Sequence, residues 1–293
     1  MKDKDQLHRF IFDDAAVRGE IVQLKDSWQA ILDRHDYPPV LRDVLGQAMA
    51  ATVLLSATIK FLGSITLQIQ SEGPVSMLVV QVKTDKTVRA MASYEDEELQ
   101  SGLKNMFGDA RLVITIEMDN ASDRYQGIVE LGDKDIAAAL EEYFRRSEQL
   151  ETRLWLAADE HAASGFLLQQ MPGDAAADGE KDDWNRFVIL ANTLKDEELQ
   201  TLSAKNILQR LYHEDNIRLF TPDLVEFACA CSKEKIEKTL HSLGYDEVKD
   251  ILLQQGSVGV DCNFCNQHYE FDSIDVETMF SGSCLVRTPD TRH

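Results

Sequence analysis

Cys229-Ala230-Cys231 and Cys262-Asn263-Phe264-Cys265 decide the fold of the last quarter of this chain, and they contain four of its five cysteines. Cys262 and Cys265 flank a predicted turn between apolar strand patterns, as in a zinc knuckle, which presents two thiolates on one side. Cys229 and Cys231 would complete a tetrahedral set of four thiolates, each about 2.3 Å from the metal. This spacing predicts one zinc ion per chain rather than four incidental buried thiols.

Other candidate ligands are less favoured than these four cysteines. His241 and His268 could each replace a thiolate, but four cysteines already complete a tetrahedral set, so both histidines are expected at the surface or in packing contacts. Cys284 follows Ser281-Gly282-Ser283 in a polar tail, and we predict that it is a bystander thiol.

The cysteines belong to a predicted C-terminal zinc-binding redox-switch module, residues 229–293. Its patterns predict a helix at 233–243, a second helix through 251–253, and a small sheet between 258 and 271. Structural zinc stabilises small modules by about 10–16 kcal/mol, whereas a whole domain is stable by only about 5–15 kcal/mol. Loss of the metal should therefore unfold the module. Because zinc-bound thiolates react with oxidants, the sequence predicts a switch that oxidation opens.

Residues 1–172 are predicted to form an α+β core domain with an antiparallel sheet and packed helices. Thr84-Asp85-Lys86 lies between two strand patterns and predicts a hairpin turn, which favours antiparallel pairing. The alternation of apolar and polar residues predicts strands at 17–24, 65–70, 75–83, 112–118, 125–131, 152–157 and 166–171. Helical patterns occupy 27–35, 40–61 and 134–146, and the second is apolar enough to lie in the core.

Residues 173–228 are predicted to form an acidic, helical and metastable linker between the two. Its first part, 174–183, is small, acidic and non-periodic. Helical patterns follow from near Thr193 and over 203–214. Because short helices with modest apolar faces are marginal alone, we expect them to cover an apolar face of the 1–172 domain.

The charge balance excludes two classes of partner. The chain has 30 Lys and Arg against 51 Asp and Glu, a formal net charge of −21. Such an acidic chain is a poor match for the phosphate backbone of a nucleic acid or for an anionic membrane surface. The C-terminal module itself has six basic and eleven acidic residues, so its zinc site does not indicate nucleic-acid binding.

Targeting and membrane signals are not found in the sequence. The N-terminal stretch has no apolar core and no small-residue cleavage site. The most apolar run, 48–59, is 12 residues long, whereas roughly 20 are needed to cross a bilayer. We therefore expect a cytoplasmic protein, in which thiols are kept reduced and paired cysteines serve metal or redox chemistry.

Catalytic motifs are also not found. No nucleophile elbow, phosphate-binding loop or dinucleotide-binding glycine motif follows a predicted strand. His35-Asp36 precedes Tyr37-Pro38 and is better explained as a helix end followed by a turn. We therefore predict no catalytic residue and no enzymatic activity.

The cysteine pattern, at the end of an acidic chain, resembles that of the heat-shock protein 33 family, the bacterial 33-kDa chaperonins. The likeness covers nearly the whole chain. Its other motifs are His35-Asp36-Tyr37-Pro38, the 50–61 helix running into Gly63-Ser64-Ile65-Thr66-Leu67-Gln68, Glu72-Gly73-Pro74, Tyr125-Gln126-Gly127-Ile128-Val129, Tyr143-Phe144, Ser147-Glu148-Gln149-Leu150 and Leu167-Leu168-Gln169.

This resemblance implies an ATP-independent holdase that binds unfolding proteins under oxidative stress. The reduced form would hold zinc and be inactive. Oxidation would form the disulfides Cys229–Cys231 and Cys262–Cys265, release the zinc, and unfold the module together with the linker. The oxidised protein, as a homodimer, would hold its clients until an ATP-dependent foldase system receives them.

Two other functions are compatible with the cysteines. A thiol-disulfide oxidoreductase could use Cys262 and Cys265, although the thioredoxin-like βαβ context is not found around them. A zinc adaptor protein would keep its metal under all conditions. Zinc release on oxidation, together with suppression of aggregation, distinguishes the holdase from both.

Overall fold

A computed structural model describes residues 5–58, 62–95, 98–119, 124–132, 134–172 and 178–281 of the chain. The chain divides into two compact units, Met1–Ala228 and Cys229–His293. The boundary therefore falls directly before Cys229, the first residue of the cysteine pattern.

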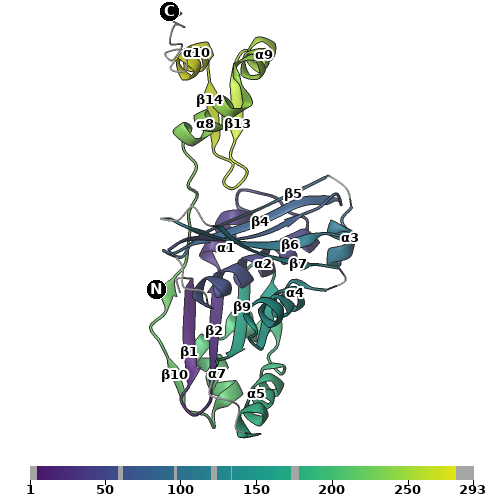
Figure 1. Ribbon diagram of the computed structural model, residues 1–293, viewed down its shortest axis with the longest axis vertical. Helices are drawn as coiled ribbons and strands as arrows, with labels where there is room; N and C mark the ends of the chain where they lie inside the picture. Colours follow the sequence, from purple (N-terminus) through teal and green to yellow (C-terminus); the bar gives the residue numbers. More distant parts are fainter. Residues whose placement is uncertain are drawn as a thin grey trace, which may run out of the picture. The chain divides into compact units, whose positions relative to one another are not determined.

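The first sheet of the Met1–Ala228 unit has the strand order β10-β1-β2-β9-β8, and β11 also pairs with β1 (Figure 1). Its pairings are all antiparallel. The strands are β1 (Gln6–Phe12), β2 (Val17–Leu24), β8 (Thr152–Ala158), β9 (Ala163–Gln170), β10 (Ile217–Leu219) and β11 (Asp223–Leu224). The predicted strands at 17–24, 152–157 and 166–171 are confirmed with boundary shifts of up to three residues, whereas β1, β10 and β11 are not predicted.

The second sheet has the order β12-β5-β4-β3-β6-β7 and is antiparallel except where β12 joins β5. Its strands are β3 (Gly63–Gln70), β4 (Val75–Lys83), β5 (Thr87–Tyr94), β6 (Arg111–Met118), β7 (Arg124–Glu130) and β12 (Glu226–Phe227). The predicted hairpin turn is confirmed, because the Lys86 backbone N–H donates to the Lys83 carbonyl at 2.9 Å. The α+β class with antiparallel sheets is therefore confirmed.

Helix α2 (Pro39–Thr58) lies between the two sheets and contacts β2, β8 and β9 of the first and β3, β4 and β5 of the second. Small residues allow this close packing: a Cβ atom added at Gly46 would lie 2.5 Å from the Ala158 side chain. By length and hydropathy α2 could cross a membrane, but 67% of that stretch is buried inside the protein, as in a core helix. The prediction extended this helix to 61, and residues 59–61 lie outside the described residues.

The smaller helices of the unit are α1 (Asp26–Leu32), α3 (Leu103–Phe107) and α4 (Ile136–Tyr143). The Asp135 carboxylate begins α4 by accepting a hydrogen bond from the Ala138 N–H at 2.7 Å. The chain then continues as a π-helical turn, η1 (Phe144–Glu148), and Gln149 ends it in the left-handed region with φ 57°. The single helix predicted over 134–146 is thus an α-helix followed by a π-helix.

Helices α5 (Asp178–Ala191), α6 (Asp196–Thr201) and α7 (Ala204–Tyr212) cover the face of the first sheet that points away from α2 (Figure 1). This contact forms a second apolar core, separate from the core around α2. Its members include Phe10, Phe12, Phe166, Phe187, Ile207, Leu211 and Tyr212. The non-periodic linker predicted at 174–183 is wrong from Asp178 onward, where α5 begins, and residues 173–177 lie outside the described residues.

The Cys229–His293 unit is small. It contains α8 (Lys233–Leu243), α9 (Tyr245–Gln255), the hairpin of β13 (Val258–Asp261) and β14 (His268–Phe271), and α10 (Ser273–Ser281). Its described core has five buried apolar side chains: Leu240, Val248, Val258, Phe271 and Val276. The two predicted helices and the small sheet are confirmed, whereas α10 is not predicted.

Candidate metal centre

The hairpin between β13 and β14 positions Cys262 and Cys265. The Cys265 and Asn266 backbone N–H groups both donate to the Cys262 carbonyl, at 3.2 and 2.8 Å. Asn266 lies in the left-handed region, with φ 55°, and Cys262 N–H donates back to the Gln267 carbonyl at 3.0 Å. These bonds close a tight loop, which is the turn predicted between the two cysteines.

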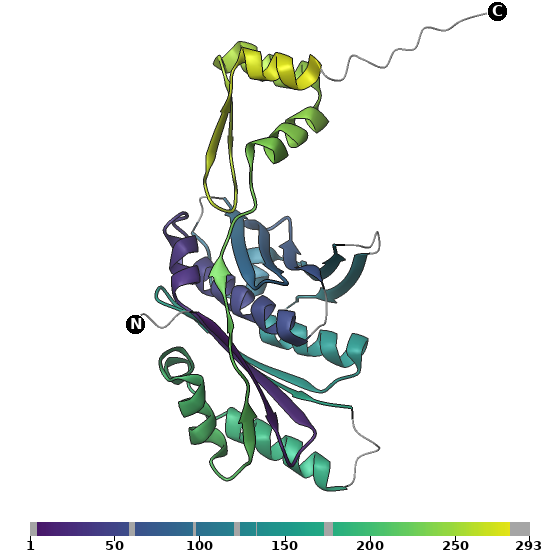
Figure 2. The ribbon, with the colours of Figure 1, turned by 90° about the vertical axis from the view of Figure 1, so that its left-hand side faces the viewer.

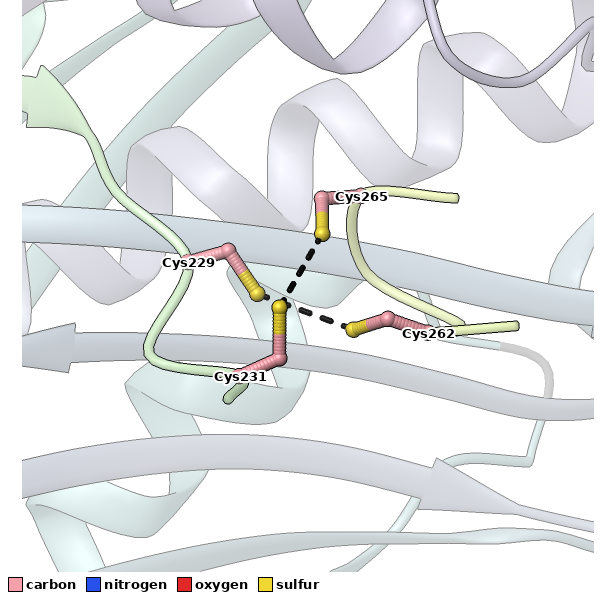
Figure 3. A group of neighbouring side chains, drawn as sticks. All are labelled: Cys229, Cys231, Cys262 and Cys265. Carbon is pink, nitrogen blue, oxygen red and sulfur yellow. Dashed lines mark hydrogen bonds between the residues drawn. The ribbon is translucent and has the colours of Figure 1, made fainter. Parts of the chain in front are cut away.

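The other pair lies in the short segment between β12 and α8. Cys229 and Cys231 are two residues apart, so their side chains can share one side of an extended chain. Ser232 ends the segment with extended dihedral angles, and its hydroxyl caps α8 by accepting from the Lys235 N–H. Figure 3 shows both side chains turned toward the loop that contains Cys262 and Cys265.

The four sulfur atoms form one cluster in which all lie within 4.8 Å of one another. The closest approaches run between the two segments, 3.7 Å from Cys229 Sγ to Cys262 Sγ and 3.4 Å from Cys231 Sγ to Cys265 Sγ (Figure 3). A zinc ion bound by four sulfurs at about 2.3 Å requires sulfurs about 3.8 Å apart along each edge of the tetrahedron. The cluster therefore has both the ligand type and the size that zinc requires.

Backbone N–H groups surround the sulfurs and stabilise their charged forms. Burial alone would raise the pKa of Cys229, but hydrogen bonds from the Cys231 N–H and the neighbouring thiols lower it to about 7. Burial raises the pKa of Cys262, against hydrogen bonds from the Phe264 and Cys265 N–H groups. N–H groups directed at sulfur are the outer partners that orient and stabilise thiolate ligands.

Cys265 shows why this cluster favours a cation. Burial raises its pKa to about 12, and its hydrogen bonds with the three neighbouring thiols act in the same direction. Four thiolates this close repel one another, so they cannot all ionise unless a positive charge lies among them. A divalent metal supplies that charge and removes the protons.

Access to the cluster is uneven. Cys262 is buried, with 8% of its surface exposed, whereas the other three cysteines are half-buried. A partly exposed thiolate is the form of cysteine that oxidants attack. The same four side chains can therefore hold a metal and react with an oxidant from solution.

The structure separates the two histidines from the cluster. His268 is paired with Asp261, with 2.7 Å between Nδ1 and the carboxylate, and the His241 ring stacks on Phe280 at 5.0 Å. Both therefore have the surface and packing roles expected from the sequence. Within the described residues, the four cysteines are the one group able to hold a metal. Cys284 lies outside the described residues.

Tyr269 is a site residue that the sequence analysis misses. It follows Cys265 by four positions on β14, and its hydroxyl donates a hydrogen bond to Cys231 Sγ at 3.2 Å. This bond raises the pKa of Tyr269 to about 12. In the sequence, Tyr269 could be noticed only as a tyrosine four residues after Cys265. A phenol so close to the zinc knuckle can reach a sulfur atom of the other segment.

Comparisons with known proteins agree over nearly the full length of the chain. A family model described as Hsp33 protein matches residues 5–272. The 33 kDa chaperonin of Nitrosococcus oceani is 47% identical over 293 residues, covering 100% of both chains. That of Methylobacillus flagellatus is 42% identical over 294 residues, again covering 100% of both.

A solved structure shows the same fold. The crystal structure of the 33 kDa chaperonin from Thermotoga maritima matches with a TM-score of 0.79. The match covers 95% of this chain and 98% of that one, at 22% sequence identity.

Proposed function

This chain belongs to the Hsp33 family, and from that premise we propose that it is a redox-regulated, ATP-independent holdase. It binds unfolding proteins and prevents their aggregation under oxidative stress. The names of its relatives support a chaperone. The observation that carries the redox part of the proposal is the cluster of four sulfur atoms within 4.8 Å of one another.

In the reduced form, Cys229, Cys231, Cys262 and Cys265 hold one zinc ion. When bound, the metal joins the segment before α8 to the β13–β14 loop, and structural zinc stabilises such units by about 10–16 kcal/mol. This contribution is decisive here because the described core of the unit has only five buried apolar side chains. The reduced protein therefore keeps this unit folded, and the chaperone is inactive.

Oxidation pairs Cys229 with Cys231 and Cys262 with Cys265. In each pair, two thiolates lose two electrons and form one S–S bond, while hypochlorous acid takes up these electrons and one proton and becomes chloride and water. Each disulfide stays within one segment, so the link through the metal is lost and no thiolate remains to hold it. The C-terminal unit then unfolds.

Unfolding of this unit releases the helices that lie before it in the chain. Phe187 of α5 stacks on Phe12 of β1 with 3.9 Å between ring centroids, and the Tyr212 hydroxyl donates to the Phe187 carbonyl at 3.0 Å. When α5, α6 and α7 leave, the apolar face of the first sheet becomes exposed. Residues 174–228 carry twelve acidic and six basic residues, so the released segment stays soluble while its apolar side chains contact clients.

The remaining features of the proposal come from the family resemblance. The oxidised protein is a homodimer in the cytoplasm, it performs no catalysis, and it transfers clients to an ATP-dependent foldase system when reducing conditions return. Its partners are unfolding proteins rather than nucleic acids or membranes, in accord with the net charge of −21.

One experiment tests this function directly. Zinc-loaded protein is treated with hypochlorous acid, and zinc release is followed with a chromogenic chelator while the aggregation of heat-unfolding luciferase is followed by light scattering. We expect zinc release and a gain in suppression together. The variant Cys284→Ser is the matched control, because it removes the fifth cysteine and leaves the four ligands in place; it should behave like the unaltered chain.

The other outcomes identify the alternatives. Zinc release without any gain in suppression rejects the holdase. Turnover of a disulfide substrate would instead support a thiol-disulfide oxidoreductase, and retention of zinc after oxidation would support an adaptor. Limited proteolysis adds a second test: equal protease resistance of residues 174–228 in both redox forms contradicts the release of this segment.

A further inference from the structure

Residues 216–228, which we call the strap, connect α7 to Cys229 and run along the edges of both sheets. β10 and β11 of the strap pair antiparallel with β1, and β12 pairs parallel with β5. In Figure 2 the strap is the light-green segment that passes along the side of the Met1–Ala228 unit. A single extended segment therefore covers one edge of each sheet.

Main-chain hydrogen bonds attach the strap to these edges. They are distributed over its whole length rather than concentrated at one end. The bonds outside the regular ladders are Asp13 N–H to Asn216 O at 2.9 Å, Phe220 N–H to Arg9 O at 2.9 Å, Val225 N–H to Asp5 O at 3.0 Å, Glu226 N–H to Lys86 O at 3.4 Å and Ala228 N–H to Val88 O at 3.1 Å.

Most side chains of the strap are exposed, but Ile217 packs against the second core and Phe227 against the core around α2. Val225 is the one buried side chain of the strap, at 3% exposure, whereas Phe220 is 41% exposed and Leu219 and Leu224 are also exposed. The ion pairs of the strap, Arg9–Asp223 at 3.3 Å and Arg218–Asp13 at 2.7 Å, lie at the surface, where such pairs add little stability. The edges of β1 and β5 therefore bind an extended chain through backbone hydrogen bonds along its whole length, together with a few apolar side chains.

We propose that the strap is an internal stand-in for client segments, and that the edges of β1 and β5 bind extended clients by strand addition once the strap has left. This inference rests on the proposed holdase function. An open strand edge offers a row of unpaired N–H and C=O groups, which pair readily with another extended chain. Recognition of the backbone does not depend on the client's sequence, and this is what a protein that binds many unfolding chains requires.

The strap also indicates which segments fit best. A client segment must lack proline at the positions of Phe220 and Val225, because both backbone N–H groups donate a hydrogen bond to the edge strand. It needs an apolar, preferably β-branched, side chain at the position of Val225, which is the one fully buried position, and apolar side chains at the positions of Ile217 and Phe227, which pack against the two cores. Unfolding chains contain many such segments, whereas folded proteins have them paired within their own sheets.

Two synthetic peptides test the inference with the oxidised, full-length protein. One has the strap sequence, residues 216–228, and the other is identical but N-methylated at Phe220 and Val225, which removes two N–H donors and keeps every side chain. We expect the first peptide to bind the oxidised form and to block its suppression of luciferase aggregation. The methylated peptide should bind at least about tenfold more weakly, because two main-chain hydrogen bonds are lost. Neither should bind the reduced form, whose edges the strap occupies.

Hydrogen exchange provides the second measurement. The Asp13 N–H, which donates to Asn216 in the closed form, should exchange faster after oxidation and become protected again when unfolded luciferase is added. Equal competition by both peptides, no competition by either, or persistent protection of Asp13 after oxidation would overturn the inference while suppression of aggregation still stands. Failure of the oxidised protein to suppress aggregation at all would overturn the proposed function, and the inference with it.

Discussion

Replacement of Phe187 by alanine tests whether the apolar contact of α5 keeps the chaperone closed. Phe187 is 1% exposed and lies in the second core, between the first sheet and α7. Its ring centroid lies 3.9 Å from that of Phe12, with the rings stacked, and 5.6 Å from that of Tyr212, with the rings perpendicular. The substitution removes both contacts and leaves a cavity under α5.

The expected size of the effect follows from this burial. Truncation of a fully buried phenylalanine costs about 3–5 kcal/mol. If α5, α6 and α7 open as one unit, the equilibrium constant for their opening rises by roughly 100- to 4,000-fold. The contacts of α2 between the two sheets are not touched by the change, so the rest of the unit should remain folded.

Native-state hydrogen exchange of the reduced, zinc-loaded protein measures this opening. Amides of α7 (Ala204–Tyr212) should exchange roughly 100- to 4,000-fold faster in Phe187→Ala, whereas amides of α2 should keep their exchange rates. Ile189→Ala is the matched control on the same helix, because Ile189 is 65% exposed and its truncation should change stability by no more than about 0.5 kcal/mol. In the aggregation assay, reduced Phe187→Ala should already suppress the aggregation of luciferase in part.

Two results would refute this reasoning. Equal exchange of α7 in Phe187→Ala and Ile189→Ala would show that the contact with Phe12 does not hold the helices closed. Faster exchange without any suppression of aggregation would show that the uncovered face of the first sheet does not bind clients.

Three further predictions concern the metal, a buried acid and a glycine. Removal of zinc with a chelator at neutral pH should unfold the Cys229–His293 unit, so that helical circular dichroism falls while exchange in α2 stays slow; an unchanged spectrum contradicts a structural metal. Burial raises the pKa of Glu20 to about 8 although Arg18 and Lys86 are near. The destabilising contribution of Glu20 should therefore be absent below pH 4.5 and grow by up to about 1.4 kcal/mol per pH unit toward pH 8. Glu20→Gln should lack this component in urea unfolding at a series of pH values, and parallel curves for both proteins would exclude it. Gly127→Ala should destabilise the first unit by about 1–3 kcal/mol, because the new Cβ would lie 2.3 Å from the buried Tyr143 ring, whereas Gln126→Ala, exposed on the same strand, should be near neutral in thermal unfolding.

Strands with one buried face were predictable because their side chains alternate. β3 shows this most clearly, with Ile65, Leu67 and Ile69 buried and the residues between them part-exposed. β1 has apolar side chains on both faces, since Leu7 lies in the core around α2 whereas Phe10 and Phe12 lie in the core under α5. Its pattern therefore does not alternate, and a sequence-based search for period two overlooks it.

The short strands of the strap could not be predicted for a different reason. β10, β11 and β12 have two or three residues each, and their partners lie in β1 and β5, far away in the sequence. Main-chain bonds to a distant strand leave no periodic trace in the side chains. In contrast, α10 did carry a local signal, because Asp272 accepts from the Ile274 and Asp275 N–H groups as an N-cap does.

The candidate metal centre was more accessible to prediction than the fold around it. Four cysteines and the turn at Cys262 are local features, and the structure brings all four sulfurs together as the spacing indicates. The hydrogen bond from Tyr269 to Cys231 depends on how β14 lies against the other segment, which is tertiary information.

The pairing of β1 with β10 and β11 has a consequence for biosynthesis. Gln6 pairs with Leu224, so β1 is made well before its edge partner. A ribosome that adds about 5–20 residues per second needs roughly 10–40 s to make the chain between them. During that interval β1 has an open edge, and the helices that cover its sheet are incomplete. Each newly made chain should thus pass through a conformation in which this edge of β1 is open, like the one proposed for the oxidised protein.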